Sequence, residues 1–197
     1  MRKVPELRFD GFDGEWEEKK IDDLARFYSG GTPSSRNSTY YNGTIPFIRS
    51  GEIHSACTEL FISEEGLLNS SAKMVDEGDL VYALYGATSG EADIIKMSGA
   101  INQAILAIKL YDNYNSVFVL NYLNKNKEII LNKYLQGGQG NLSAQIVRNL
   151  NIKIPFFGEQ EKIGDLFKNI DALIEKQEDK VSKMEDFKKS MLQKMFP

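Results

Sequence analysis

The chain has 197 residues, of which 42% are apolar and 26% charged, and its 28 acidic and 24 basic residues give a net charge of −4. This composition is typical of one globular domain with an appendage, and the acidic total gives no support by itself to nucleic-acid binding, for which a basic domain is usual. A single cysteine, Cys57, excludes an internal disulfide and any multi-cysteine zinc site, and the lack of a signal peptide or a membrane-length apolar run predicts a cytoplasmic protein with no membrane contact.

The first 158 residues alternate short strand-like and helical segments. Strands are expected at 16–21, at 45–48, at 79–84, within 100–110 and at 151–155. Helices are expected at 22–27, at 64–69, at 116–135 and after Ser143. Glycine-rich loops lie between them at 30–38, 85–90 and 137–141. Residues 1–158 therefore predict a mixed α/β domain that ends at the connection 155–158.

Residues 159–197 form a second predicted unit, an uninterrupted helix from 159 to 196. Its seam is a row of residues at alternating three- and four-residue steps, the heptad pattern of a helix that packs along another helix. The seam consists of Ile163, Leu166, Ile170, Leu173, Gln177, Lys180, Met184, Phe187 and Met191. Phe167, Ile174 and Val181 widen its apolar face. The helix would be roughly 57 Å long at 1.5 Å per residue, so the predicted fold class is α+β with a C-terminal coiled-coil helix.

Two polar residues, Gln177 and Lys180, interrupt the middle of this seam. Polar seam residues lower stability but can fix the register and orientation of a helix pair. Alternatively, the two side chains lie at a solvent-facing crossing. The sequence leaves both interpretations open.

The sequence contains no recognisable catalytic or metal-binding constellation. Residues 86–90 fail as a phosphate loop, because the glycines are too close together and Glu91 stands where lysine is needed. His54 is the only histidine, which excludes histidine metal clusters and two-histidine mechanisms. The chain also lacks the Asn/Asp-Pro-Pro-Tyr/Phe stretch expected of a methyltransferase that acts on an adenine amino group. We therefore expect a binding protein with no catalytic residue, metal or cofactor of its own.

Several short motifs occur along the chain in a characteristic order. They are Trp16, 30–34 (GGTPS), 40–48 (YYNGTIPFI), 78–81 (GDLV), 86–90 (GATSG), 102–104 (NQA), 137–142 (GGQGNL), 152–155 (IKIP), 159–163 (EQEKI) and 188–196 (KKSMLQKMF). Each motif is weak alone, but the ordered set resembles the specificity subunits of Type I restriction-modification systems over nearly the whole chain.

This resemblance implies a target-recognition domain at 1–158, which binds double-stranded DNA at one half of a split site, and a spacer helix at 159–197. The partners it implies are a modification subunit, which binds S-adenosylmethionine and methylates adenine, and a restriction subunit, which uses ATP and Mg²⁺. A full subunit has two recognition domains and two helical regions, whereas this chain has one of each. A homodimer paired through antiparallel helices would read two inverted half-sites. The alternative is a truncated remnant, or a recombination donor cassette, that forms no active complex.

Candidate DNA contacts lie in four polar loops, because side chains on loops and helix ends can reach base edges in a groove. They are Ser34, Ser35, Arg36 and Asn37; Arg49, Ser50, Glu52 and His54; Tyr85, Thr88 and Ser89; and Gln139, Asn141, Gln145 and Arg148. The candidates for phosphate contacts are Lys73, Lys96, Lys125 and Lys133. Because the total charge is acidic, the chain alone is expected to bind DNA weakly and to gain affinity with modification subunits.

Overall fold

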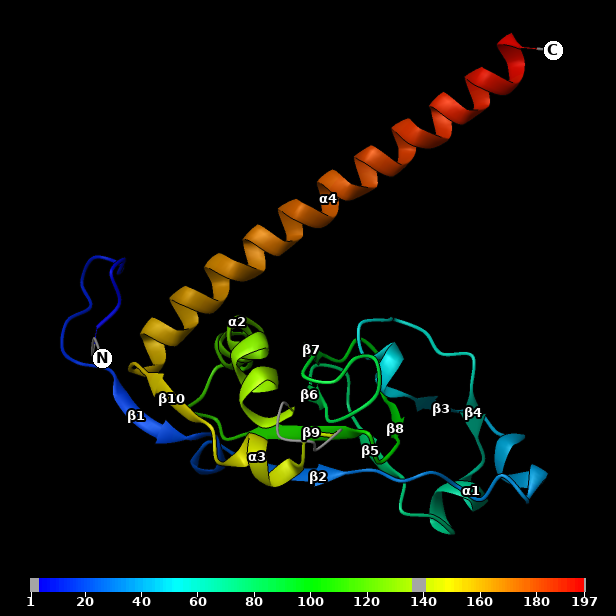
Figure 1. Ribbon diagram of the computed structural model, residues 1–197, viewed down its shortest axis with the longest axis horizontal. Coiled ribbons are helices and arrows are strands. Elements are labelled where there is room, and N and C mark those ends of the chain that lie inside the picture. The colour runs from blue at the N-terminus through cyan, green and yellow to red at the C-terminus, as the bar shows by residue number, and fades with distance from the viewer. Residues whose placement is uncertain (1–3, 136–140, 197) are drawn as a thin grey trace.

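The computed structural model describes residues 4–135 and 141–196 and has two parts, a body and a long helix that projects away from it (Figure 1). The strands are β1 (Glu17–Lys20), β2 (Ala25–Ser29), β3 (Ile45–Ile48), β4 (Phe61–Ile62), β5 (Lys73–Val75), β6 (Leu80–Ala83), β7 (Ala92–Ile94), β8 (Gly99–Ile101), β9 (Ile105–Leu110) and β10 (Asn151–Ile154). The helices are α1 (Glu64–Leu68), α2 (Ser116–Leu135), α3 (Ala144–Arg148) and α4 (Phe157–Met195), with short 3-10 turns η1 (Ile21–Asp23), η2 (Ser38–Tyr41) and η3 (Ser50–Glu52). The α+β class with a long C-terminal helix is confirmed.

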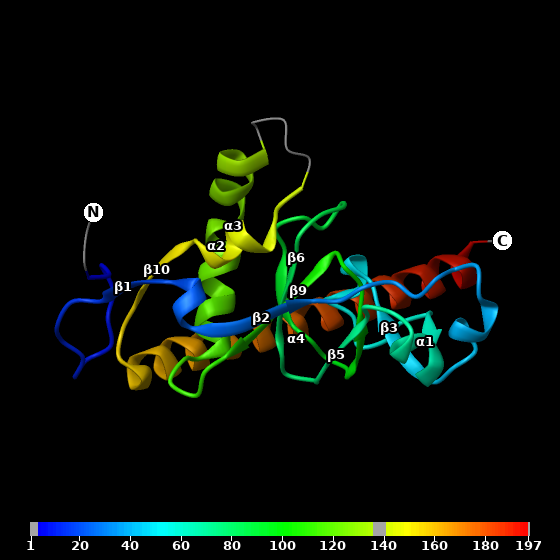
Figure 2. The same ribbon diagram turned by 90° about the horizontal axis from the view of Figure 1, so that it is seen from below.

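The body contains two four-stranded sheets and a separate strand pair. One sheet is antiparallel throughout, with the order β2-β9-β6-β7. The other has the order β4-β3-β8-β5 and is mixed, because β3 and β8 run parallel while the outer strands pair antiparallel. The first and last strands of the body, β1 and β10, pair with each other. This pair brings the start of the chain next to the start of α4 (Figure 2).

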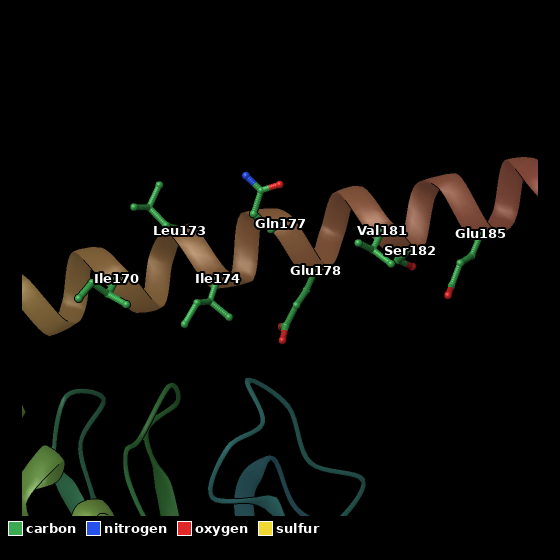
Figure 3. Close-up of a pocket in the computed structure, with 8 residues that line it drawn as sticks. All are labelled: Ile170, Leu173, Ile174, Gln177, Glu178, Val181, Ser182 and Glu185. Carbon is green, nitrogen blue, oxygen red and sulfur yellow. The ribbon is translucent and has the colours of Figure 1, made fainter.

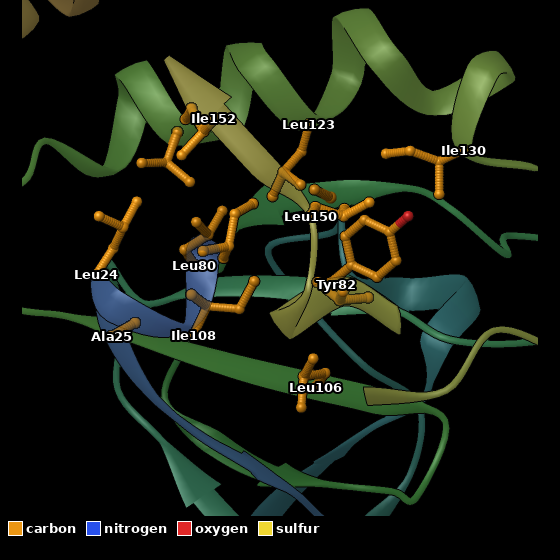
Figure 4. Close-up of a cluster of buried hydrophobic side chains, with 14 of the residues drawn as sticks. Leu24, Ala25, Leu80, Tyr82, Leu106, Ile108, Leu123, Ile130, Leu150 and Ile152 are labelled. Carbon is orange, nitrogen blue, oxygen red and sulfur yellow. The ribbon is translucent and has the colours of Figure 1, made fainter. Parts of the chain in front are cut away.

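The antiparallel sheet is covered on both faces, since successive side chains of a strand point to opposite sides. In β9, Leu106 and Ile108 belong to the cluster that includes α2, and Figure 4 shows them below Leu123 of that helix. Ile105 and Ala107 belong to the second cluster, which includes residues of the mixed sheet. The two sheets and α2 therefore form three layers around two apolar interfaces.

The N-terminal end of α4 is fixed to the body by buried polar contacts. Gln160 accepts a hydrogen bond from the backbone N–H of Asn115 at 3.0 Å. Glu159 accepts two hydrogen bonds from the guanidinium of Arg8, at 2.8 and 2.7 Å. Gly164 allows close packing on the segment before α2, because a Cβ there would lie 2.7 Å from the side-chain oxygen of Asn115. The first two turns of α4 are anchored by these contacts.

Most predicted segments correspond to observed elements. The strands expected at 16–21, 45–48, 79–84 and 151–155 are β1, β3, β6 and β10, and the helices expected at 64–69, at 116–135 and after Ser143 are α1, α2 and α3. The long helix begins at Phe157, two residues before its predicted start. The division into a recognition domain and a helical domain stays a prediction.

The helix expected at 22–27 is wrong. The segment forms η1 and then β2, in which Ala25 and Phe27 pair with β9. The local signal was the pair of aspartates, and Asp23 does accept the backbone N–H of Lys20, but strand pairing outweighs a helix propensity of this size.

The segment 100–110 holds two strands, β8 and β9, because the side chain of Asn102 accepts the backbone N–H of Ala104 and stabilises a turn between them. β4, β5 and β7 have only two or three residues each, too few for an alternating pattern to indicate them.

Candidate nucleic-acid interface

The four predicted DNA-contact loops have their roots around one turn of the body, residues 101–104. Four backbone hydrogen bonds of 2.8 to 3.4 Å make the connection: Gly31 to Ile101, Asn102 to Ile48, Leu84 to Ala104, and Leu142 to Leu84. The first loop therefore bonds to Ile101, the second bonds to Asn102, and the third bonds to Ala104 through Leu84. The fourth loop bonds to Leu84 and so reaches the turn only through the residue that follows β6. The fold brings together segments that are up to a hundred residues apart in sequence.

Gly30 shows why the first loop needs glycine at its root. A Cβ at this position would lie 1.7 Å from the carbonyl oxygen of Ile101, and side chains essentially never approach a backbone atom that closely. The chain can therefore pass β8 only without a side chain here. Beyond this point the loop runs outward to η2.

In the outer part of the first loop, Asn37 has a structural role, while the three residues before it are exposed. The Asn37 side chain accepts hydrogen bonds from the backbone and the hydroxyl of Thr39, at 3.1 and 2.8 Å, and so caps η2. Ser34, Ser35 and Arg36 are exposed. Arg36 forms no ion pair with any residue in the described ranges 4–135 and 141–196, so its guanidinium is available to a ligand.

The second loop holds its arginine in an ion pair. Glu52 accepts hydrogen bonds from Nε and Nη2 of Arg49, at 3.1 and 2.8 Å, and from the Arg49 backbone N–H at 3.0 Å. The hydrogen bond from the Arg49 side chain is the main reason why the pKa of Glu52 is lowered. Arg49 is thus oriented by Glu52 and keeps the N–H groups of Nη1 free.

His54 joins the second loop to the third. Its ring nitrogens lie 2.7 Å from Asp93 and 3.0 Å from Glu91, and Lys127 of α2 lies 2.9 Å from the other oxygen of Glu91. Burial lowers the pKa of His54, but the two carboxylates outweigh it and the net pKa is raised. Burial also disfavours the charged form of Glu91 and so raises its pKa, but hydrogen bonds from Lys127 and His54 lower the pKa by more, and the net pKa of Glu91 is lowered. The cluster connects two loops and α2 by charge.

Further hydrogen bonds hold the third loop in place. The Thr88 hydroxyl donates to the carbonyl of Ser50 at 3.1 Å, and the Ser89 hydroxyl donates to the carbonyl of Leu84 at the same distance. Tyr85 packs against the core. In Figure 2 this loop, between β6 and β7, points to the same side as the C-terminal end of α2. These three side chains stabilise the loop.

The fourth loop leads into α3 and carries Arg148. Nε of Arg148 donates to Asp22 at 2.6 Å, and its guanidinium carbon lies 5.7 Å from the ring centre of Phe27. The hydrogen bond with Asp22 raises the pKa of Arg148. Only one of its five N–H donors is used, so four remain for a ligand. Asn141 and Gln145 are exposed, whereas Gln139 lies outside the described residues.

Of the four predicted phosphate contacts, Lys73, Lys96 and Lys125 form no ion pair with the described residues, and Lys133 lies 5.1 Å from the ring centre of Tyr134. Within 4–135 and 141–196, no group of three or more acidic, histidine or cysteine residues could hold a metal ion. Over the same residues, no helix combines the length and apolar character needed to cross a bilayer.

Beyond its first turns, the seam of α4 packs against no other element among residues 4–135 and 141–196. Ile163, at its start, packs against the core, but Leu173, Met184 and Phe187 are 60%, 64% and 67% exposed. Figure 3 shows Leu173 and Gln177 on the side of α4 that faces away from the body. A surface hollow lined by Ile170, Leu173, Ile174, Gln177 and Val181, among others, runs along the helix. The stripe is long, apolar and open.

Residues 13–183 match the family model for the Type I restriction modification DNA specificity domain. The chain belongs to this family. A curated relative, the Type I restriction enzyme EcoR124I/EcoR124II specificity subunit of Escherichia coli, is 24% identical to this DNA specificity domain over 170 residues, which are 82% of this chain and 42% of the relative. The MjaIX specificity subunit of Methanocaldococcus jannaschii is 28% identical over 172 residues, 82% of this chain and 39% of the relative.

The crystal structure of the Type I restriction-modification S subunit from M. genitalium has the same fold. It matches with a TM-score of 0.67 at 15% identity, over 92% of this chain and 46% of that chain. The DNA specificity domain described here therefore spans about two fifths of the length of the curated relatives that it matches.

Several residues that shape the interface of this DNA specificity domain were not predicted. Asp22 holds Arg148, while Asp93 and Lys127 complete the His54 cluster. The partners are separated by 126, 39 and 36 residues in the pairs Arg148–Asp22, His54–Asp93 and Lys127–Glu91. No local pattern indicates contacts at such distances, so only the fold reveals them.

Proposed function

We propose that this chain is the non-catalytic DNA-recognition subunit of a Type I restriction-modification complex, and that it works in the cytoplasm as a homodimer. The observation that carries the proposal is the pairing of two features on one chain. One is a single body with four polar loops rooted at residues 101–104. The other is a 39-residue helix whose apolar stripe is mostly exposed and uncovered by the residues that the structure describes.

The body would read one half of a bipartite site in double-stranded DNA. Arginine is the side chain best suited to bidentate recognition of guanine, and Arg36 and Arg148 retain the free donors to do this. Asn141 and Gln145, both exposed beside Arg148 in sequence, are suited to adenine. Arg49 and His54 would contribute from positions fixed by carboxylates.

The other candidates have two proposed roles. Ser34 and Ser35 would contact the backbone or bases from the outer loop, as would Gln139 from the fourth. Asn37, Ser50, Glu52, Tyr85, Thr88 and Ser89 would mainly position the loops, because their side chains or carbonyls are engaged within the body. The exposure of Ser34 and Ser35 supports contact by these two residues more than by the second group.

Two copies would pair through antiparallel α4 helices. The partner helix would cover the seam from Ile163 to Met191, and a two-fold axis would place the two bodies at opposite ends. Two-fold symmetry of the protein requires two identical half-sites in inverted orientation. The helix, roughly 58 Å long at 1.5 Å per residue, would set their separation.

Chemistry would come from partner subunits, by family resemblance. A modification subunit with S-adenosylmethionine would methylate adenine, and a restriction subunit with ATP and Mg²⁺ would join it. The dimer has twice the net charge of −4, which is −8. An acidic dimer binds DNA weakly at physiological salt unless companions supply positive charge, so affinity is expected to rise when modification subunits bind.

The deciding experiment is co-expression of this chain with a modification subunit encoded beside it, followed by mapping of methylated adenines in the host genome. The expected motif has two identical half-sites in inverted orientation around a fixed spacer. An asymmetric motif would contradict the homodimer. Failure to co-purify with the modification subunit, together with no methylation, would favour the alternative of a remnant or donor cassette.

A further inference from the structure

An apolar groove lies at the base of α4, beside the start of the seam. It has a volume of about 370 Å³, and its walls come from the N-terminal segment, from the only tryptophan and from α4. The main apolar lining residues are Leu7, Phe9, Trp16, Ile163, Leu166 and Phe167. Leu7 is 91% exposed, so one wall of this groove faces solvent in the single chain.

The groove is held open by Arg8. This residue donates to Glu159 at 2.7 and 2.8 Å and to the carbonyls of Asp13 and Gly14 at 2.8 and 2.7 Å. Arg8 thereby fixes the N-terminal segment to the first turn of α4, with Leu7 and Phe9 on either side of it in sequence. The groove is preformed rather than assembled by a ligand.

The opposite end of α4 carries exposed apolar residues without a contact to the body. Leu192, Met195 and Phe196, here called the tip, are 50%, 72% and 67% exposed. Figure 1 shows this end of α4 far from β1 and from the N-terminal end of the helix. An exposed apolar patch at the end of a projecting helix is typical of a surface that another protein segment covers.

The charges along α4 favour an antiparallel second copy as that partner. Residues 159–171 hold four acids and two lysines, a net charge of −2, while residues 183–195 hold four lysines and two acids, a net charge of +2. Antiparallel copies place opposite charges beside each other at both ends. Parallel copies would place like charges together, which is unfavourable.

The seam further selects one register. In an antiparallel pair, the two kinds of seam position face each other across the interface. If Gln177 of each copy faces Lys180 of the other, the inner apolar seam residues face one another: Leu166 with Met191, Ile170 with Phe187, and Leu173 with Met184. At each end of the seam, Ile163 then faces Lys194. A shift by one heptad instead places Ile170 opposite Lys180 and Leu173 opposite Gln177. The polar residues therefore favour the first register.

In this register, the tip of each helix reaches the groove of the other copy. In an antiparallel pair the numbers of facing residues have a constant sum, which the facing of Gln177 and Lys180 sets. Met195 and Phe196 are therefore level with residues 162 and 161, and Leu192 is level with residue 165. These levels border Ile163 and Leu166, which line the groove. The apolar tip and the apolar groove thus meet twice, once at each end of the helix pair.

We propose that the tip of α4 seats in the groove at the base of α4 in a second copy, and that the Gln177–Lys180 layers set this register. The proposal rests on the homodimer proposed above. The seated tip joins each helix end to the body of the other copy through the N-terminal segment and Trp16. The angle between helix pair and body, and hence the spacing of the two half-sites, is then fixed at both ends.

The first test uses Trp16 as a native reporter, because it lines the groove and is the only tryptophan. Dilution of the wild-type dimer into the monomer range should shift the tryptophan emission to longer wavelength. The double variant Met195→Ser/Phe196→Ser should lose most of this shift and raise the dimer Kd at least tenfold. Leu68→Ser, which replaces an exposed leucine on α1, should change the Kd less than twofold.

The second test uses disulfide cross-linking with Cys57→Ser as background. Ile170→Cys/Phe187→Cys should form a covalent dimer on mild oxidation, as should Leu7→Cys/Phe196→Cys, whereas Ile170→Cys/Lys180→Cys should not. A wild-type chain that stays monomeric overturns both the tip and the homodimer. The tip proposal is overturned, and the homodimer is left standing, if the wild type is a dimer but the Ile170→Cys/Lys180→Cys variant cross-links. The same conclusion follows if the tip substitutions leave the dimer Kd unchanged.

Discussion

Leu173→Ala removes an apolar side chain from the middle of the α4 seam without touching the body. Leu173 is 60% exposed in the single chain, and burial of a whole leucine side chain contributes about 2 kcal/mol, so the proposed dimer would gain about 1.2 kcal/mol from this residue in each copy. If alanine retains about a third of that gain, the dimer loses about 1.6 kcal/mol over two copies, and its Kd rises about 15-fold. Both registers considered above bury this residue, so the prediction tests the helix pairing itself.

Sedimentation equilibrium over a concentration series measures the two dissociation constants. Leu68→Ala is the matched control, because Leu68 is 82% exposed and lies on α1 in the body. Circular dichroism should show an unchanged helix content, since alanine has the highest helix propensity. A Leu173→Ala dimer that dissociates like the wild type and like the control would refute the assignment of this stripe to a helix partner.

Three further predictions concern the body. Gly30→Ala should lower the free energy of unfolding, measured by urea denaturation, by about 3 kcal/mol, because the added Cβ would lie 1.7 Å from a backbone oxygen. The control Gly51→Ala places its Cβ in open space and should change the free energy of unfolding by no more than about 0.5 kcal/mol. Equal effects of the two substitutions would contradict the close approach at Gly30. The raised pKa of His54 stabilises the fold, and this contribution is fully present below the unfolded pKa of 6.5 and is lost as the pH rises through the higher folded pKa. The stability advantage of wild type over His54→Asn should therefore shrink as the pH rises above 6.5, and an advantage that grows would contradict the carboxylate pairing. In the complex with a modification subunit, Arg36→Gln and Arg148→Gln should each raise the Kd for cognate DNA about tenfold or more in fluorescence anisotropy, and wild-type binding by both would exclude them as base contacts.

The sequence predicts the helices and most strands of four residues, and it misses the strands of two or three residues for physical reasons. The period of α4 extends over 39 residues, so chance cannot imitate it, whereas β4 has two residues and offers no period at all. At 22–27 the local capping signal is correct, but the pairing of β2 with β9 decides the structure. Such pairing depends on residues 77 to 85 positions away, from Ser29 with Leu106 to Ala25 with Leu110.

The candidate interface divides in the same way. Glycine, serine and asparagine mark the loops locally, so their positions follow from sequence. The ion pairs that hold Arg148 and His54 connect residues from different elements, and like the shared root at 101–104 they exist only after the chain has folded. Which arginines remain available to a ligand therefore follows from the structure alone.

The four hydrogen bonds named above, which attach the loops around residues 101–104, join main-chain atoms. One side-chain hydrogen bond, from the Thr32 hydroxyl to Gln103 at 2.6 Å, adds to the attachment of the first loop. The main-chain hydrogen bonds do not depend on which side chains follow them in the loops, apart from positions such as Gly30, where no side chain fits. Substitutions farther along each loop leave the attachment intact, so the loops can drift apart among descendants while the scaffold is inherited unchanged. New sequence preferences can then evolve one loop at a time, by point substitution or by exchange of a loop, without passing through an unfolded intermediate protein.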